Sequence, residues 1–295
     1  MSKITRREAG RRILMSSAAA MAAAGGLRGA QWINSVVRGV QVGAQSYSFR
    51  DRPLGMAIDA MRTIGLGECE LWQGHVEPQH LPADQLTFWR ETAPLSDFHR
   101  IRGQFDKAGI RLYAYNYSFN KDMNGAEFDR GFAMAKALGV RYITASSYIS
   151  LVPRIQEYAR KYKIVVAMHG HDDTSDDDAF STAATFEKAL AMSQHYIAVN
   201  LDIGHFVAAG GDPVSFIQQH HDRIVTIHIK DRKKDHGPNM PLGQGDTPII
   251  PVLHLLRDNQ WEIPANIEYE YGKPGMDTVA EVQKCYAYCR KALET

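Results

Sequence analysis

Short β-rich runs alternate with longer amphipathic segments from residue 40 to the end of this chain. Runs of this composition and spacing predict strands that are each followed by a helix. Eight such units in succession are what a closed barrel requires, so the pattern predicts an α/β fold, a (β/α)8 TIM barrel. The predicted strands are Val40–Gln45, Glu68–Trp72, Arg111–Asn116, Tyr142–Ser146, Ile164–His169, Ala198–Asp202, Ile224–Ile229 and Ala265–Glu270.

The helical segments between these runs indicate one barrel domain over residues 31–295. Several of them end in a glycine turn signal, as at Ala108-Gly109 and Leu138-Gly139. A doubly wound open sheet is the alternative fold, but no G-x-G-x-x-G motif follows the first strand to favour it. The predicted helices are Met56–Ile64, Phe98–Ala108, Glu127–Leu138, Val152–Lys161, Thr182–Gln194, Val214–His220, Ile249–Asp258 and Val279–Leu293.

Residues 1–30 have the composition of an export signal. Arg6 and Arg7 precede the short apolar run Ile13–Ala24, which resembles a twin-arginine signal peptide. The alternatives are a signal anchor or a basic amphipathic helix, but the run is short and alanine-rich for a bilayer span. No later stretch reaches the roughly 18 apolar residues of a transmembrane helix. We therefore expect a periplasmic or otherwise exported protein without stable membrane insertion after signal removal.

The charge balance argues against a nucleic-acid partner. Without residues 1–30 the chain carries 28 basic and 32 acidic residues, a net charge of −4. Proteins that bind the phosphate backbone normally concentrate Lys and Arg on one face. We therefore expect a small molecule, and no nucleic acid, as the ligand.

Residues that can bind a metal gather at the ends of four of the later predicted strands. In a TIM barrel these carboxyl ends form the active site. Side-chain alternation allows His169 and His171 to face the barrel mouth together, and it allows the same for the pairs His228/Lys230 and Glu268/Glu270. One residue from each strand end would complete a mixed nitrogen and oxygen site: His169, Asp202, His228 and Glu268.

Such a donor set suits Mn, Co, Zn or Fe better than Mg, which prefers oxygen ligands and keeps its waters. We expect Mn as the divalent cofactor, ahead of the other three. Each residue taken alone has an ordinary explanation, and Asp202 in particular fits a turn or a helix cap. The joint occurrence at four strand ends is what favours a metal site.

These residues give the chain a resemblance to the xylose isomerase-like TIM-barrel superfamily, in the branch of sugar phosphate isomerases/epimerases. The resemblance covers roughly residues 40–292. It rests mainly on Leu201-Asp202-Ile203-Gly204-His205, His228-Ile229-Lys230-Asp231 and Ile267-Glu268-Tyr269-Glu270, supported by Cys69-Glu70-Leu71-Trp72 and Pro241-Leu242-Gly243-Gln244-Gly245.

The resemblance implies roles for individual residues. Asp202, His228 and Glu268 would be metal ligands. His171, His205 and Lys230 would lie near the substrate, with Glu70 in the pocket wall, although Glu70 could instead pair with a nearby arginine. Trp72 could stack on a sugar face. Glu270 would contact the substrate, and it would take the place of Glu268 as the base if the register were shifted.

Two positions depart from the family pattern. His169 and Gln244 stand where glutamates are expected. Imidazole is a good ligand for the metals named above, so His169 is compatible with a metal site. The exchange of a proton between two metal-bound glutamates, which the family's ketose epimerases use, is nevertheless in doubt for this chain.

The sequence thus favours a divalent-metal-dependent sugar isomerase or epimerase. Glu268 would abstract a proton next to a carbonyl through a metal-stabilised enediolate, and His171 or His205 would move the second proton. A β-eliminating lyase of the same superfamily, acting on a 3-keto-glycoside, is the first alternative, and export beside glycosides favours it. A non-catalytic periplasmic sugar-binding barrel is the second alternative. Relatives often dimerise, so the resemblance also allows a homodimer.

Overall fold

The computed structural model describes residues 31–193, 195–273 and 275–295. The predicted export signal lies outside these residues. Trp32–Thr295 forms one compact unit. Among the described residues, no helix has the length and apolar character needed to cross a membrane.

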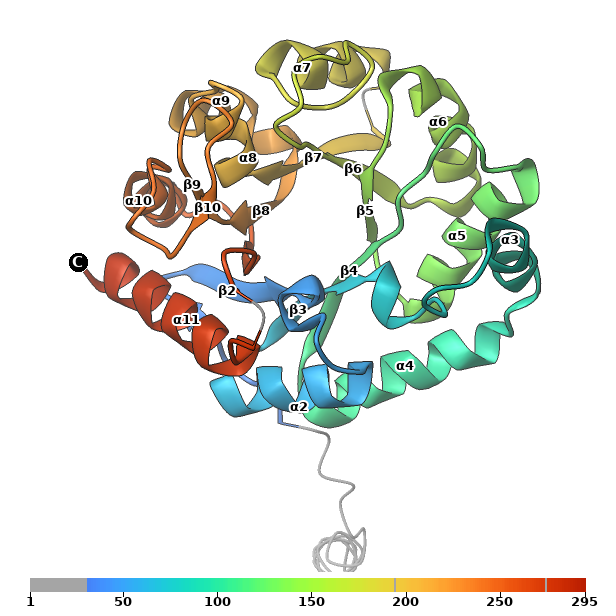
Figure 1. The fold of residues 1–295 in the computed structure, drawn as a ribbon, viewed down its shortest axis with the longest axis horizontal. Helices are drawn as coiled ribbons and strands as arrows, with labels where there is room; N and C mark the ends of the chain where they lie inside the picture. Colours follow the sequence, from blue (N-terminus) through green and yellow to red (C-terminus); the bar gives the residue numbers. More distant parts are fainter. Residues whose placement is uncertain (1–30, 194, 274) are drawn as a thin grey trace, which may run out of the picture. The chain divides into compact units, whose positions relative to one another are not determined.

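Eight parallel strands close into a barrel. Their order is β2-β11-β8-β7-β6-β5-β4-β3, and pairing of β2 with β3 completes the ring. In Figure 1 the helices surround these strands. The predicted (β/α)8 TIM barrel is therefore confirmed. The strands are β2 (Val40–Gln45), β3 (Glu68–Trp72), β4 (Arg111–Asn116), β5 (Tyr142–Ser146), β6 (Val165–His169), β7 (Ile197–Asp202), β8 (Ile224–Ile229) and β11 (Ala265–Ile267).

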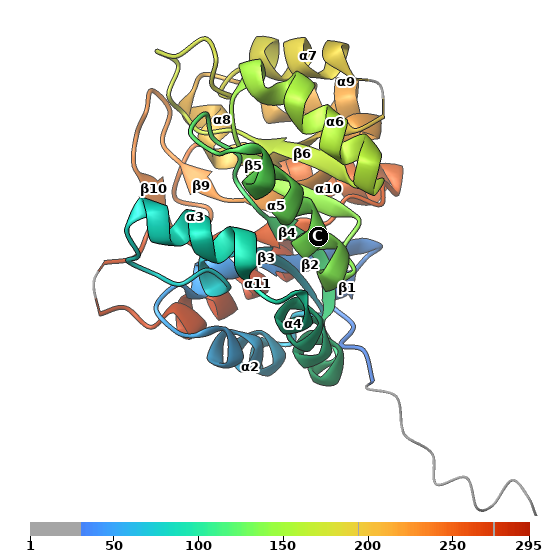
Figure 2. The same ribbon diagram turned by 90° about the vertical axis from the view of Figure 1, so that its right-hand side faces the viewer.

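Two short pairings mark the two ends of the barrel. β1 (Val36–Val37) runs antiparallel to the start of β2, and β9 (Asp231–Arg232) pairs with β10 (Asn239–Met240) beyond the end of β8. In Figure 2, β1 lies to the right of the barrel strands and the β9–β10 hairpin to their left. The side of the hairpin is thus the carboxyl end, where a TIM barrel carries its active site.

The helices match the prediction with two additions, α3 and α8. Gly65, Gly109 and Gly139 end α2, α4 and α5 in the left-handed conformation, with φ of 90°, 72° and 70°. The helices are α2 (Leu54–Ile64), α3 (Ala83–Thr92), α4 (Leu95–Ala108), α5 (Gly125–Leu138), α6 (Val152–Tyr162), α7 (Ala183–Met192), α8 (Ile203–Ala208), α9 (Pro213–His220), α10 (Ile249–Asn259) and α11 (Thr278–Glu294).

Three differences from the prediction have physical reasons. The only buried side chain of α3 is Arg90, so α3 has no apolar stripe for a sequence pattern to detect. α8 is six residues long and begins directly after β7, where the sequence reads as the end of a strand. β11 ends at Ile267, not Glu270, so Glu268 and Glu270 follow the strand.

The barrel interior is polar, and the main apolar core lies between strands and helices. Alternate strand residues such as Val42, Ile143 and Leu201 point outward and pack with the buried faces of the helices. Strand residues of the opposite parity carry polar groups that are at most 1% exposed: Glu68, Glu70, Thr144, Asn200, Thr226 and Asn266. This arrangement places hydrogen-bonding groups along the axis that leads to the carboxyl end.

Candidate metal centre

Four side chains from neighbouring strands converge at the carboxyl end of the barrel. One donor atom from each lies within 4.8 Å of the corresponding atoms of the other three, and all four residues are buried. β6 and β7 each end on one of them, β8 carries the third, and the fourth directly follows β11. The four are His169, Asp202, His228 and Glu268. The structure thus brings together the set of residues that the sequence singled out as metal ligands.

His228 is held between two carboxylates. Its Nδ1 is 3.0 Å from Glu268 Oε2, and its Nε2 is 2.8 Å from Glu70 Oε2. Thr144 Oγ1 in turn donates to Glu70 Oε1 at 2.6 Å. Burial alone would lower the pKa of His228, but the charges of Glu70 and Glu268 outweigh burial and raise this pKa well above its ordinary value.

Glu70 therefore lies beneath the four-residue cluster. It is fully buried, and the hydrogen bonds to Thr144 and His228 fix both of its oxygens. The expectation placed Glu70 in the pocket wall, with an arginine as its alternative partner. The structure places it instead behind His228, on the side away from Asp202 and Glu268.

Asp202 uses its two oxygens differently. Oδ1 accepts a hydrogen bond from the His205 backbone N–H at 2.7 Å and caps α8. Oδ2 is buried and has no hydrogen bond, although Lys230 Nζ lies 2.9 Å away. The interpretations of Asp202 as a helix cap and as a ligand are therefore compatible, because each uses a different oxygen.

Lys230 is a buried ammonium group surrounded by acids. Its Nζ lies 2.8 Å from Glu268 Oε2, 2.8 Å from Glu270 Oε2 and 2.9 Å from Asp202 Oδ2. Burial would lower its pKa, but these three carboxylates raise the pKa above its ordinary value, so Lys230 stays charged. Gly204 leaves room for it, since a Cβ there would lie 2.8 Å from Lys230 Cγ.

His205 lies between two cationic side chains, and its Nδ1 is also 3.4 Å from Asp172 Oδ1, so one ring nitrogen can accept a hydrogen bond from a cation while the other donates to the carboxylate. Lys230 Nζ lies 2.9 Å from its Nε2, and Arg232 Nη1 lies 2.6 Å from its Nδ1. Arg232 also pairs with Asp172 Oδ1 at 2.7 Å. Neither ring nitrogen of His205 is thus free, which makes His171 the better placed of the two for proton transfer. Sequence reasoning missed Arg232 and Asp172, because Asp172 begins an acidic run that resembles a solvated loop.

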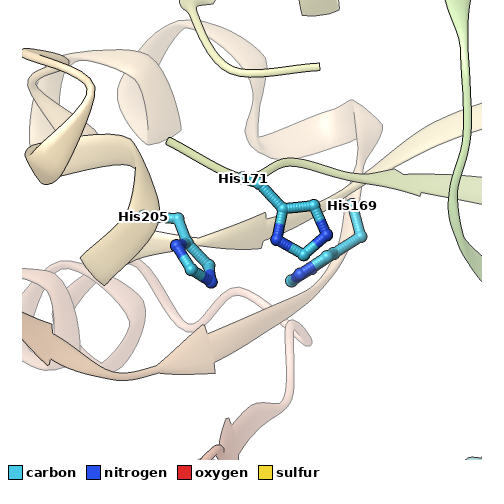
Figure 3. Close-up of side chains that lie close together, drawn as sticks. All are labelled: His169, His171 and His205. Atoms are coloured by element: carbon cyan, nitrogen blue, oxygen red, sulfur yellow. The ribbon is translucent and has the colours of Figure 1, made fainter. Parts of the chain in front are cut away.

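His171 lies beside the cluster and is the most exposed of the three neighbouring histidines. Figure 3 shows its ring beside those of His169, from the end of β6, and His205, from α8. The ring centroids lie 4.9 Å and 5.0 Å away, respectively. Ser146 Oγ contacts His171 Nε2 at 3.0 Å. Desolvation, followed by neighbouring positive charge, lowers the pKa of both His169 and His171, which favours neutral imidazoles.

A cavity of about 250 Å³ opens over the cluster, and we call it the central chamber. His169, His228 and Glu268 line it together with three of the predicted substrate-binding residues, Trp72, His171 and Glu270. The other three, Glu70, His205 and Lys230, lie behind this lining. Its remaining lining residues are Gln45, Tyr47, Gln73, Asn116, Ser118 and Ser146.

Comparison with known proteins connects this site to a family. The family model described as "xylose isomerase-like TIM barrel" matches residues 58–289. An inosose dehydratase from Clostridium tetani is 24% identical over 127 residues, which is 37% of this chain and 41% of that protein. The chain thus matches about two fifths of the length of this curated relative.

Two solved structures share the fold. One is D-psicose 3-epimerase in the presence of D-fructose, at 14% identity and a TM-score of 0.64, covering 87% of this chain and 100% of that one. The other is the IOLI protein with a bound zinc atom, at 16% identity and a TM-score of 0.62, covering 86% and 96%. Because the family model spans most of the barrel, this chain belongs to the xylose isomerase-like TIM barrel family.

Proposed function

We propose that this protein is a divalent-metal-dependent isomerase or epimerase that moves a proton next to the carbonyl of a sugar-like substrate. The observation that carries the proposal is the buried group His169, Asp202, His228 and Glu268, with three of its members facing the central chamber. Similar proteins include an epimerase and a dehydratase. Their names give polyhydroxylated substrates, D-psicose and inosose.

The donor set fits a divalent cation. His169 Nδ1 is buried without a hydrogen-bond partner and is available to a ligand, and the buried Asp202 Oδ2 has the Lys230 ammonium, at 2.9 Å, as its charged neighbour. Two imidazoles and two carboxylates suit Mn, Zn, Co or Fe, with Mn the first choice. The similarity to a zinc-containing structure supports the same conclusion.

The second contact of His228 strengthens this fit. Its Nδ1 faces Glu268 and Asp202, at 3.0 and 3.8 Å, while its Nε2 is held by Glu70. Metal-binding histidines almost always donate their other ring N–H to a carboxylate or carbonyl, which fixes the ring and makes it a better ligand. Glu70 would thus be a positioning residue for His228.

The protein's own residues would then divide the work of proton transfer. A bound divalent cation would act as a Lewis acid on a carbonyl and a neighbouring hydroxyl of the substrate. Glu268 lines the central chamber and would accept a proton from the adjacent carbon. His171, a neutral imidazole in the same chamber, would hold or return the second proton. Lys230 would balance the carboxylate charge from behind.

A specific observation also favours β-elimination as a second candidate. β6, the fifth strand of the barrel, ends in His169, where a two-glutamate epimerase would need its second carboxylate. A carboxylate base with imidazoles on the β6 side suits removal of a proton followed by loss of a leaving group. The similarity to an inosose dehydratase points the same way.

The deciding experiment follows substrate in deuterated water by NMR, with metal-loaded and metal-stripped protein and with ketoses, aldoses and keto-glycosides. Metal-dependent deuterium incorporation without fragmentation supports the isomerase or epimerase, whereas an unsaturated product with a released group supports the eliminating enzyme. Glu268→Gln should abolish exchange, and the exposed Glu157→Gln is the matched control. A filled metal site without exchange for any substrate would contradict both enzymes and leave a sugar-binding barrel.

A further inference from the structure

A second cavity adjoins the central chamber and shares a wall with it. This side chamber, of about 380 Å³, and the central chamber are both lined by Ser146, His169 and His171. The contact between Ser146 Oγ and His171 Nε2, at 3.0 Å, lies in this shared wall. A ligand that occupies both chambers would therefore pass beside His171.

The two volumes matter for the size of the ligand. Small-molecule sites usually measure about 300–1,000 Å³, and the central chamber, at about 250 Å³, falls below that range. The side chamber is the larger of the two. A single small sugar would fill only the central chamber and leave the larger adjoining space to water.

The lining of the side chamber suits a sugar ring. Tyr148 and Ala179 are half-buried and provide apolar surface, and Phe119 and Phe180, at most 2% exposed, line the chamber beside them. The C–H face of a pyranose packs on such surfaces. The polar lining consists of hydroxyl, amide and carboxylate groups that can bind sugar hydroxyls: Asn120, Ser147, Asp173 and Asp176. Of these groups, Ser147 Oγ is buried and has no hydrogen-bond partner.

The side chains that line the two chambers disfavour a phosphorylated ligand. Among the described residues that line the two chambers, none is Lys or Arg. Phosphate groups are normally bound by guanidinium, ammonium or helix N-terminal N–H groups. Asp173 and Asp176 would instead repel a phosphate in the side chamber. Both chambers therefore suit neutral, hydroxyl-bearing rings.

We propose that the side chamber is a second sugar-ring subsite, so that the substrate is an unphosphorylated disaccharide or glycoside with its reacting ring in the central chamber. The identity of the reacting ring rests on the proposed function, but binding in the side chamber does not. His171 then lies next to the bond that joins the two rings.

The test is calorimetric titration of the manganese-loaded protein with D-glucose, maltose, 4-nitrophenyl β-D-glucoside and D-glucose 6-phosphate. We expect the two-ring ligands to bind at least about tenfold more tightly than D-glucose, a difference of about 1.4 kcal/mol. The phosphate ester should bind no better than D-glucose. Equal affinity for one-ring and two-ring ligands, or preferred binding of the phosphate ester, would overturn the proposal.

Two variants assign the effect to the side chamber. Tyr148→Ala removes an aromatic wall, and Ser147→Leu fills the space, so each should lower two-ring affinity about tenfold more than D-glucose affinity. Tyr148→Phe keeps the ring and should retain two-ring binding. Because Tyr148 forms a β-bridge with Ala179, thermal unfolding must show that both variants fold. An unchanged ratio of affinities in folded Ser147→Leu would refute the subsite.

Failure of this proposal is distinguishable from failure of the proposed function. If deuterium exchange needs metal and Glu268 but the ratio of two-ring affinity to D-glucose affinity is unchanged in the variants, the enzymatic proposal is supported and the subsite is refuted. If no substrate takes up deuterium but Ser147→Leu selectively loses affinity for two-ring ligands, the subsite is supported and the enzymatic proposal is refuted.

Discussion

Glu68, the first residue of β3, is a buried acid without a partner. It is 1% exposed, and neither carboxylate oxygen has a hydrogen bond. Burial raises its pKa to about 8, opposed by Arg111 and assisted by Glu70. Glu68 also lines a cavity of about 610 Å³ that contains the β1 residue Val36, at the barrel end opposite the metal centre. We predict that Glu68→Gln stabilises the protein in a pH-dependent way.

The sign follows from proton binding. Between the unfolded pKa, near 4.5, and the folded pKa, about 8, the native state keeps a proton that the unfolded state releases. Unfolding therefore becomes easier as the pH rises, by about 1.4 kcal/mol per pH unit and at most about 5 kcal/mol over the whole window. Allowing for relaxation around the carboxylate, Glu68 should lower the free energy of unfolding of the wild type by about 1.5–3 kcal/mol as the pH rises from about 5 to about 7.

The assay is urea unfolding of metal-stripped protein at several pH values from 5 to 8.5. Relative to wild type, Glu68→Gln should show little change at about pH 5 and a growing gain toward pH 8, with the free-energy difference reaching the range above by pH 7. Glu157→Gln, on an exposed face of α6, is the control and should leave the slope unchanged. Parallel pH profiles for wild type and Glu68→Gln would refute the reasoning, because they would mean that Glu68 titrates normally.

Three further predictions concern the metal centre. Glu70→Gln should weaken metal affinity about 10–100-fold, because His228 would lose the carboxylate that holds its ring. Competition with a chelating dye measures this affinity, and an unchanged value would rule out the positioning role of Glu70. Gly204→Ala should lower the free energy of unfolding by about 1–3 kcal/mol, because its Cβ would meet Lys230, and wild-type stability would show that the side chain can shift. Removing metal with EDTA should lower the melting temperature, because a metal that binds only the folded protein stabilises it. Glu268→Gln should reduce that drop, and an equal drop would contradict Glu268 as a ligand.

Much of the barrel could be predicted because strands carry a local signal. The alternation of Val42 and Ala44 with Gln41 and Gly43, for example, records which strand face packs on helices. The four candidate ligands were predictable for the same reason, since the fold dictates that strand ends meet at one face. The position of Glu268 just beyond a strand was not, because β11 ends at Ile267 and only the Glu268 backbone N–H continues its pairing, by donating to Ile229 O of β8.

The contacts behind the candidate ligands could not be predicted because they join residues distant in sequence. Glu70 and His228 are 158 positions apart, and Arg232 and Asp172 are 60 apart. Each residue has an ordinary local explanation, such as an acid beside an arginine or a solvated loop. Only the closed ring of strands decides which acid faces which base. The burial of Glu68 is likewise invisible locally, because strand composition does not report how an interior layer is filled.

The division between a polar barrel interior and an apolar layer outside the strands has a consequence for how such a protein can change. Most of its buried apolar packing lies between strands and helices and involves residues such as Leu201 and Ile143. The reactive groups instead project inward from alternate strand positions. A substitution at an inward position, such as a histidine at residue 169, leaves the outward neighbour Met168 in place. Chemistry can therefore diverge along one parity of the strands while the architecture is inherited through the other.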